Sequence, residues 1–188
     1  MERCLSSKRL YEGKILNLRV DQVEVSRNGR RATREVVEHR SDVAVLARDG
    51  EGRFLLVRQF RYPLNAEIIE IPAGVMERGE EPLQSAQREL REETGYRAAK
   101  WTPMPAIYSS PGFSDEKLFV FLAEELAWDP LRPDDDEDIA LLRFDDEQAR
   151  ALLDSREPQD AKTLMALAWY FAGQSLTKTH SRKLPLSP

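Results

Sequence analysis

The stretch Gly74-Val-Met-Glu-Arg-Gly-Glu80-Glu-Pro-Leu-Gln-Ser-Ala-Gln-Arg88-Glu-Leu-Arg-Glu-Glu-Thr-Gly95-Tyr96 determines how the rest of the chain is interpreted. Its second half predicts a helix over residues 82–94, because proline is favoured in the first turn of a helix and glycine just past its end. At 100° per residue, Leu83 and Leu90 of this helix share one apolar face. The stretch before the helix, from Gly74 to Gly79, is expected to be a loop.

Three carboxylates lie together on another face of the same predicted helix. Glu89, Glu92 and Glu93 are spaced so that they become neighbours on the helix surface, where like charges repel. Mg²⁺ is a hard ion that takes oxygen ligands, and it can neutralise a phosphate group while water attacks the phosphorus atom. The alternative is a solvated acidic face without a function, which three glutamates alone would favour.

The spacing of the whole stretch resembles the signature of the Nudix hydrolases. The matching pattern is Gly74, five residues, Glu80, seven residues, Arg88-Glu89-Leu90, one residue, Glu92-Glu93, one residue and Gly95. Tyr96 then stands where the family usually has an aliphatic residue. The resemblance covers about 100 residues, from Ser41 to Leu142. It implies the α/β (α+β) fold class, as a Nudix α/β/α sandwich with a mixed sheet.

The same resemblance implies a metal site and an assignment of roles within it. Glu89, Glu93 and the main-chain carbonyl group of Ala73 correspond to the metal ligands of the family, and the ion is Mg²⁺ or Mn²⁺. Glu92 is implied to be a further ligand or a catalytic helper. Arg88 lies beside the ligands and is expected to orient a supporting carboxylate such as that of Glu80.

Sequence outside the helix resembles the ADP-ribose pyrophosphatase branch of this family. Pro111 follows Gly95 by sixteen residues, and residues 57–61 and 70–74 are also similar to that branch. The resemblance implies hydrolysis of the diphosphate bond of ADP-ribose to AMP and ribose 5-phosphate. Pyrophosphohydrolases of other nucleotide sugars, such as GDP-mannose, are the closest alternative. A non-catalytic Nudix-fold ADP-ribose sensor is an alternative of another class, which the complete set of signature carboxylates disfavours.

The candidates for substrate binding are Glu35, Arg61, Glu70, Gly112 and Glu116. Arg61 offers a planar, bidentate donor to a diphosphate, and the carboxylates of Glu70 and Glu116 can accept hydrogen bonds from ribose hydroxyl groups. Gly112 lets the backbone come close to a ligand. By resemblance, Glu35 reaches the nucleoside in the other subunit of a dimer. A surface salt bridge for Arg61 and a plain turn at residues 111–112 are the alternatives.

An acidic stretch over residues 134–138 precedes the last strand expected in the fold. In the branch that the chain resembles, a loop at this place carries a carboxylate that approaches the metal ions. Glu137 matches that glutamate, and Asp135 stands where some members have the catalytic base. The alternative is a solvated acidic loop.

The first forty residues alternate apolar and polar residues and therefore predict strands. Asn28-Gly29 predicts a tight hairpin turn, and the one-residue slip between Val20 and Val23 predicts a β-bulge. A hairpin of this size buries little surface alone, so we expect residues 1–40 to form a dimerisation region. Residues 41–174 are then the Nudix domain and residues 175–188 a polar, mobile tail.

Composition limits the class of protein. The chain has 188 residues with 28 basic and 33 acidic side chains, and this acidic balance argues against binding to nucleic acid. It contains no apolar run of about 20 residues, the length that spans a bilayer. The single cysteine excludes an internal disulfide framework and a thiolate zinc site. The start is charged and does not resemble a signal peptide, so we expect a cytoplasmic protein.

Overall fold

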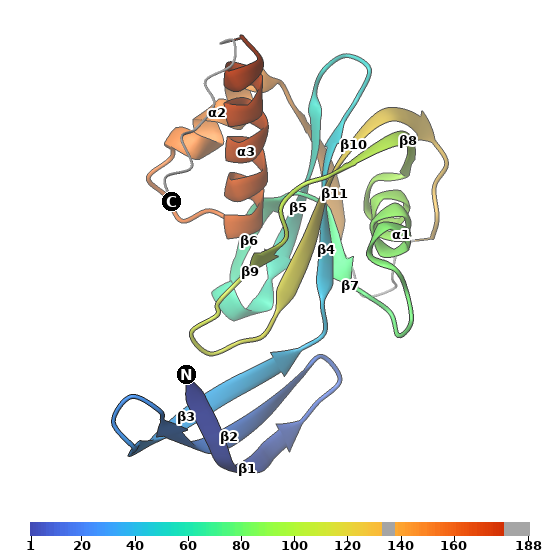
Figure 1. Cartoon of the computed structure of the whole chain (residues 1–188). Coiled ribbons are helices and arrows are strands. Elements are labelled where there is room, and N and C mark those ends of the chain that lie inside the picture. Colours follow the sequence, from blue (N-terminus) through green and yellow to red (C-terminus); the bar gives the residue numbers. More distant parts are fainter. Residues whose placement is uncertain (133–137, 179–188) are drawn as a thin grey trace.

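The computed structural model describes residues 1–132 and 138–178, with side chains up to Gly173. Its strands form two separate sheets (Figure 1). The first has three antiparallel strands, β1 (Glu2–Glu12), β2 (Leu16–Val25) and β3 (Arg30–His39). The second has eight strands, and among the described residues it is covered by three helices. No helix in the described ranges is long and apolar enough to cross a bilayer.

The turn between β2 and β3 forms where the sequence predicts it. Gly29 adopts a φ of 66°, a conformation that favours glycine, and the Asn28 side chain accepts a hydrogen bond from Arg30 N. The pairing of β2 with β3 has no interruption, so the bulge predicted within β2 is not there. Register shifts lie instead between β1 and β2, at the steps from Cys4 to Ser6 and from Arg9 to Tyr11. Because β2 continues without a bulge, Val20 and Val23 point to opposite faces of the three-stranded sheet.

The eight-stranded sheet has the order β11-β5-β4-β10-β8, with three short strands beside this path. The long strands are β4 (Asp42–Arg48), β5 (Phe54–Arg61), β8 (Tyr96–Pro103), β10 (Lys117–Trp128) and β11 (Ile139–Phe144). The short strands are β6 (Ala66–Glu70), β7 (Ala73–Val75) and β9 (Ile107–Tyr108). β4 and β10 are parallel and the other pairs are antiparallel, which makes the sheet mixed.

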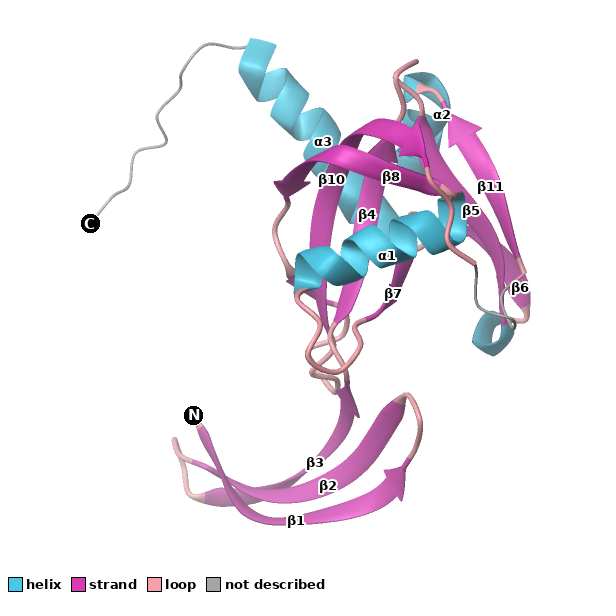
Figure 2. Ribbon diagram, turned by 90° about the vertical axis from the view of Figure 1, so that its right-hand side faces the viewer, coloured by secondary structure: helices cyan, strands magenta, loops and turns pink. Residues whose placement is uncertain are grey.

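Helices cover both faces of this sheet, as Figure 2 shows for α1 on one side and α3 on the other. The helices are α1 (Pro82–Thr94), α2 (Asp146–Asp154) and α3 (Ala161–Lys178). Successive residues of a strand point to opposite faces. Val43 and Val45 of β4 therefore join the apolar cluster of α1, whereas Ala44 and Leu46 join that of α2 and α3. The expected α/β/α sandwich is confirmed.

The sheet opens between β4 and β5, and this opening positions the site. The two strands pair directly only at their hairpin end, through Ala47 with Leu55 and Arg48 with Phe54. Farther on, β4 pairs with β7 and β5 pairs with β6. Because β6 and β7 belong to one continuous segment, residues 66–75 enter the middle of the sheet. Arg61, at the end of β5, lies at this opening.

The boundaries of the elements agree with the sequence at α1 and differ elsewhere. α1 begins at Pro82 and ends at Thr94 as predicted, with Gly95 at a φ of 77°. The expected loop from Gly74 to Gly79 begins inside β7, because β4 offers an unpaired edge there. β8 was not expected from the sequence, and α3 continues past Gly173 to Lys178. The rest of the predicted tail lies outside the described residues.

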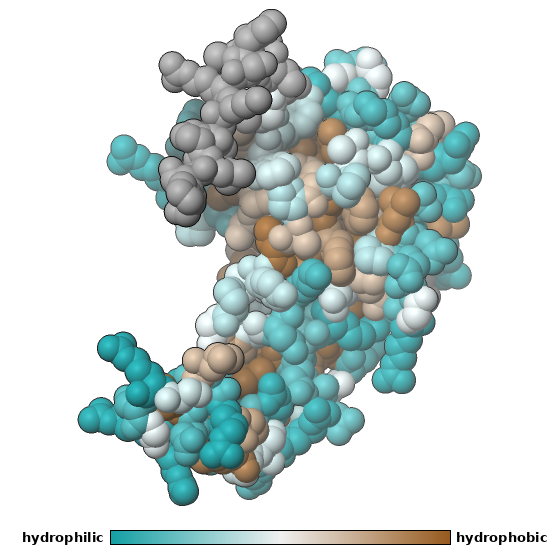
Figure 3. All heavy atoms as spheres, viewed as in Figure 1, coloured by the Kyte–Doolittle hydropathy of each residue, from teal (hydrophilic) through white to brown (hydrophobic). Residues whose placement is uncertain are grey.

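The loop over residues 109–116, which connects β9 and β10 of the second sheet, forms hydrogen bonds with β3 of the first sheet. Val37 N of β3 donates to Phe113 O at 2.8 Å, and Asp115 N donates back to Val37 O at 3.2 Å. His39 N donates to the carboxylate of Asp115 at 2.8 Å. The three-stranded sheet itself projects from the main body (Figure 3) and buries few side chains, and every residue of β1 is exposed.

Candidate functional site

The acidic face of α1 lies against β7. Glu89 and Glu93 are 7% and 9% exposed, and Glu93 accepts a hydrogen bond of 3.1 Å from Ala73 N. Gly74 leaves the space that the Glu89 carboxylate occupies, because a side chain at this position would overlap that carboxylate. Glycine thus lets the Glu89 carboxylate lie against β7, and three of the predicted site residues, Ala73, Glu89 and Glu93, lie together.

Arg88 balances part of this negative charge. Its guanidinium donates to Glu80 at 3.1 Å, to Glu89 at 2.6 Å and to Glu92 at 2.9 Å, so the expected contact with Glu80 is present. Burial works against the charge of Arg88, but its carboxylate partners, Glu80 first, raise the pKa of Arg88 above its ordinary value. Burial also acts on Glu80, where the hydrogen bond from Arg88 holds the pKa below its usual range. One arginine cannot neutralise all the glutamates of this face.

This donor set fits a divalent cation. Carboxylate oxygens are the ligands that Mg²⁺ and Mn²⁺ prefer, and the room at Gly74 lets Glu89 sit close to the main chain of β7. Glu92 is half-buried beside Glu89 and Glu93 and shares Arg88 with Glu89. The carboxylates of Glu89, Glu92 and Glu93 are thus the residues that could hold the ion.

A pocket of about 320 Å³ lies at the opening between β4 and β5. It adjoins the acidic face of α1 through Ala73, Gly74 and Val75 of β7. The other residues that line it are mainly charged, and they are Asp42, Arg61, Ile68, Glu70, Glu116, Leu118, Asp160 and Lys162. A larger hollow, lined in part by Asp49 and Arg143, involves none of the predicted site residues.

Glu70 is buried at the centre of this pocket wall, with 1% of its surface exposed. Arg61 Nε donates to its Oε1 at 2.5 Å and Arg61 Nη2 to its Oε2 at 2.9 Å, and Lys162 Nζ also donates to Oε2. Burial raises the pKa of Glu70, but Arg61 and Lys162 outweigh burial and hold this pKa below its usual range. The predicted substrate residues Arg61 and Glu70 therefore bind each other, with Glu70 buried and Arg61 partly exposed at the pocket.

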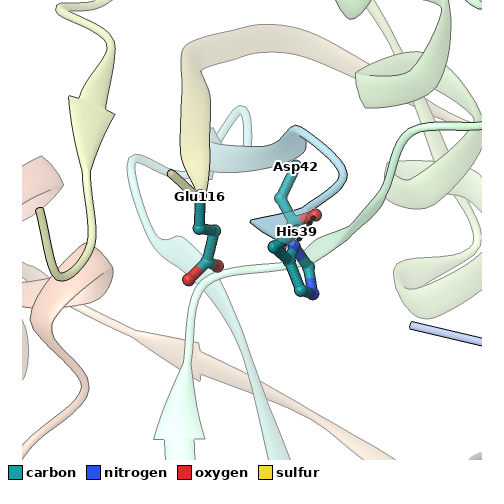
Figure 4. A group of neighbouring side chains, drawn as sticks. All are labelled: His39, Asp42 and Glu116. Carbon is teal, nitrogen blue, oxygen red and sulfur yellow. Dashed lines mark ion pairs between the residues drawn. The ribbon is translucent and has the colours of Figure 1, made fainter. Parts of the chain in front are cut away.

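Glu116 lies across the pocket beside Asp42 and His39, as Figure 4 shows. The three side chains each offer a ligand atom within 4.8 Å of the others, and so form a second candidate metal-binding group. His39 Nδ1 lies 2.6 Å from Arg40 O and 3.6 Å from Asp42 Oδ1. Burial, the largest influence, raises the pKa of the Asp42 carboxyl group to about 7. Ser109 donates to Glu116, which the sequence had suggested as a ribose acceptor.

The remaining predicted site residues are not among the described residues that line this pocket. Gly112 lies in the loop that joins the two sheets, and a side chain there would meet open space within this chain. Glu35 is exposed on β3, opposite Val20 of β2. Asp135 and Glu137 lie outside the described residues, so the structure does not place them.

Sequence reasoning missed three polar residues of the pocket. Asp42 precedes a buried strand, and Asp160 and Lys162 stand at the start of an apolar helix. A polar set before an apolar helix normally indicates an N-terminal cap. The signal was therefore present at residues 160–163, but nothing in the sequence connects it with Glu70, which is ninety-two residues from Lys162.

Comparison with known families assigns nearly all of the chain. Residues 38–167 match the model of the NUDIX domain. Residues 2–37 match the model of the nucleoside diphosphate sugar hydrolase N-terminal domain. The family boundary thus falls within β3, near its end.

Individual relatives cover most of the chain. It is 46% identical over 170 residues to the ADP-ribose pyrophosphatase of Bacillus subtilis (strain 168), covering 89% of this chain and 91% of that protein. It is 35% identical over the same length to the methanol dehydrogenase activator of Bacillus methanolicus, with the same coverage. Among solved structures, an ADP compounds hydrolase superposes with a TM-score of 0.82 at 21% identity, covering 92% of this chain and 95% of that one.

Proposed function

Since this chain belongs to the Nudix family, we propose that it hydrolyses the diphosphate bond of ADP-ribose, giving AMP and ribose 5-phosphate. Family membership establishes the class of enzyme, and the substrate is the step that we add. The relative that is 46% identical carries the name ADP-ribose pyrophosphatase, which supports this choice.

The observation that carries the proposal is the position of a charged pocket directly beside the acidic face of α1. Glu93 contacts Ala73, and Ala73 also lines the pocket that contains Arg61. A diphosphate bound in this pocket would therefore lie next to the carboxylates that suit a divalent cation. A pocket of about 320 Å³ has the size of a site for a small organic ligand.

Each residue has a defined role in this proposal. Glu89, Glu93 and the carbonyl group of Ala73 hold a divalent cation, with Mg²⁺ as the ion we propose, and Glu92 assists them. A bound cation of this kind neutralises the diphosphate oxygens and makes water more acidic. Arg61 donates hydrogen bonds to the diphosphate and orients it.

Arg88 keeps the carboxylates of Glu80, Glu89 and Glu92 in fixed positions before the substrate arrives. Glu116 accepts a hydrogen bond from a ribose hydroxyl group, since it lines the same pocket. Glu70 is held by two cations, and we assign to it the orientation of Arg61 rather than contact with the substrate. Gly112 remains a proposed contact of the substrate through its backbone.

The N-terminal sheet supports a homodimer. β1 is exposed along its whole length and forms an edge of the three-stranded sheet, and such an edge offers unpaired main-chain groups to another chain. We propose that residues 1–40 pack against a second copy of the chain and that Glu35 reaches the nucleoside of the partner site. Asp135 and Glu137 stay candidates for a carboxylate that acts on the bound substrate.

The test is a substrate comparison with product identification. Purified protein is assayed with ADP-ribose, GDP-mannose, NADH and a nucleoside triphosphate at equal concentration with Mg²⁺. We expect AMP and ribose 5-phosphate from ADP-ribose, with the highest kcat/KM of the set. A tenfold preference for GDP-mannose or NADH, about 1.4 kcal/mol in transition-state binding, would contradict the substrate. Binding of ADP-ribose without any hydrolysis would indicate a sensor.

A further inference from the structure

The start of α3 is fixed to the segment that leads into the site. Asp160 Oδ2 accepts hydrogen bonds from Thr163 N at 2.9 Å and from Thr163 Oγ1 at 2.6 Å. Thr163 Oγ1 in turn accepts a hydrogen bond of 2.8 Å from Ile71 N. Ile71 lies between Glu70 and Ala73 in the chain, so these buried bonds hold α3 against residues that line the pocket.

Lys162 makes the second connection between α3 and this segment. Its side chain is 13% exposed, and its Nζ donates to Glu70 Oε2 and, at 3.0 Å, to Asp160 Oδ1. Glu70 also accepts two hydrogen bonds from Arg61. One buried carboxylate thus lies between two cations that come from β5 and α3, elements far apart in the sequence.

This arrangement distributes charge unequally. Arg61 and Lys162 share Glu70, and Lys162 also bonds Asp160, so two cations balance two carboxylates and Arg61 does not have Glu70 to itself. Arg61 is the exposed member, because 39% of its side chain is accessible against 13% for Lys162 and 2% for Glu70. Its Nη1 group donates to no residue in the described part of the chain. Arg61 therefore presents the exposed positive charge of this group to the pocket.

We propose that Lys162 is a positioning residue for substrate binding: by sharing Glu70 with Arg61, it leaves the Arg61 guanidinium with the positive charge that holds the diphosphate. This inference rests on the function proposed above, because it concerns the same pocket. Without Lys162, Arg61 is the one cation of this group against the carboxylates of Glu70 and Asp160, and a pocket that Glu116 also lines has less attraction for an anion.

The first experiment compares two substitutions at this position. Lys162→Met keeps the length of the side chain and removes its charge, whereas Lys162→Arg keeps the charge. We expect Lys162→Met to raise KM for ADP-ribose about tenfold with kcat within about threefold of the unchanged protein, because binding and not chemistry is affected. Lys162→Arg should stay within about threefold in both constants. Unchanged KM in folded Lys162→Met protein overturns the proposal.

A double-mutant cycle separates action through Arg61 from direct contact with the substrate. In a protein that already carries Arg61→Met, adding Lys162→Met should raise KM by less than about twofold, since the residue through which Lys162 acts is gone. A further tenfold rise in that background would show that Lys162 acts independently of Arg61, and the positioning role would be wrong.

The control is Arg48→Met, which removes another half-buried cation beside α3. Arg48 contacts Tyr170 of α3 and Asp146 of α2, and it does not line the pocket. It should lower Tm without changing KM.

Calorimetry with inorganic pyrophosphate in metal-free protein tests the inference separately from the substrate. If the protein hydrolyses no ADP-ribose, the proposed function fails, yet Lys162→Met should still weaken pyrophosphate binding about tenfold. Equal pyrophosphate affinity in both proteins counts against the inference.

Discussion

Two networks of charged side chains lie close to Ala73, and they differ in their ratio of carboxylates to cations. In the α1 network, formed by Glu80, Arg88, Glu89, Glu92 and Glu93, several carboxylates share one guanidinium. In the β6 network, formed by Arg61, Glu70, Lys162 and Asp160, two cations are balanced by two carboxylates. The first therefore has an excess of negative charge, whereas the second is balanced and presents its exposed cation, Arg61, to the pocket.

The difference explains how one site can suit a cation and an anion at once. Unbalanced charge that is partly buried raises the free energy of the folded protein unless a ligand compensates it. A divalent cation compensates the α1 network, and a diphosphate accepts hydrogen bonds from the exposed guanidinium of the β6 network. Both kinds of charge are present in a metal-bound nucleoside diphosphate, the substrate class of the proposed function. The predictions below change one network at a time.

The largest effect is expected for Glu93→Gln in the α1 network. The substitution keeps the size of the side chain but removes a charge that we assign to the cation, so kcat should fall at least about 10²-fold, since the ion supplies several kcal/mol of charge stabilisation. Steady-state kinetics with a Mg²⁺ titration measures the loss. Glu147→Gln, on the exposed surface of α2, is the control. Near-normal turnover of folded Glu93→Gln protein would remove Glu93 from the metal site.

Arg88→Met should show that the α1 network is destabilised by its own charge. Glu80, Glu89 and Glu92 would lose the guanidinium that they share, and the free energy of unfolding should fall by about 2–3 kcal/mol in metal-free protein. Urea unfolding measures it. The control is Arg91→Met on the same helix, where Arg91 bonds Asp129 near the surface and a loss below about 1 kcal/mol is expected. Equal losses would mean that Arg88 is an ordinary surface partner.

Arg61→Met changes the β6 network. We expect KM for ADP-ribose to rise about tenfold and kcat to fall by a smaller factor. The reason is that Arg61 holds the diphosphate in the ground state and in the transition state alike. Circular dichroism checks that the protein stays folded around the buried Glu70. A fall in kcat with unchanged KM would instead place Arg61 in the chemical step.

Asp42→Asn should give the smallest effect, and it depends on pH. Burial raises the pKa of Asp42 to about 7 in the folded protein, above the ordinary value of 3.8. As pH rises from 4 to 7, the unfolded chain loses the proton of Asp42 while the folded protein keeps it, so the native residue loses stability over this range.

Asparagine does not titrate, so the Asp42→Asn protein does not lose stability in this way between pH 4 and pH 7. The stability of Asp42→Asn relative to the unchanged protein should therefore improve from pH 4 to pH 7 by about 1 kcal/mol, a value reduced for solvent screening, and stay level above pH 7. Thermal unfolding at several pH values measures this, with Asp154→Asn on the exposed end of α2 as control. A difference that does not vary with pH would show that Asp42 titrates normally.

Local signals in the sequence were sufficient for some features. Pro82 and Gly95 delimit α1 because each acts on its own backbone, and the carboxylates of Glu89 and Glu93 share a face because helix geometry alone places them there. The Asn28-Gly29 turn formed for the same reason. The family signature is a pattern of spacing along the chain, and the resemblance that it carries implied the α/β/α fold.

Features that depend on pairing between distant segments could not be predicted from local sequence. The opening between β4 and β5, the bulges in β1 and the extra strand β8 depend on which strand lies next to which. Arg61 and Glu70 were predicted to bind the substrate, but only the fold shows that they bind each other. Lys162 joins them from ninety-two residues beyond Glu70, because packing of α3 on the sheet, and no local pattern, brings opposite charges together out of water.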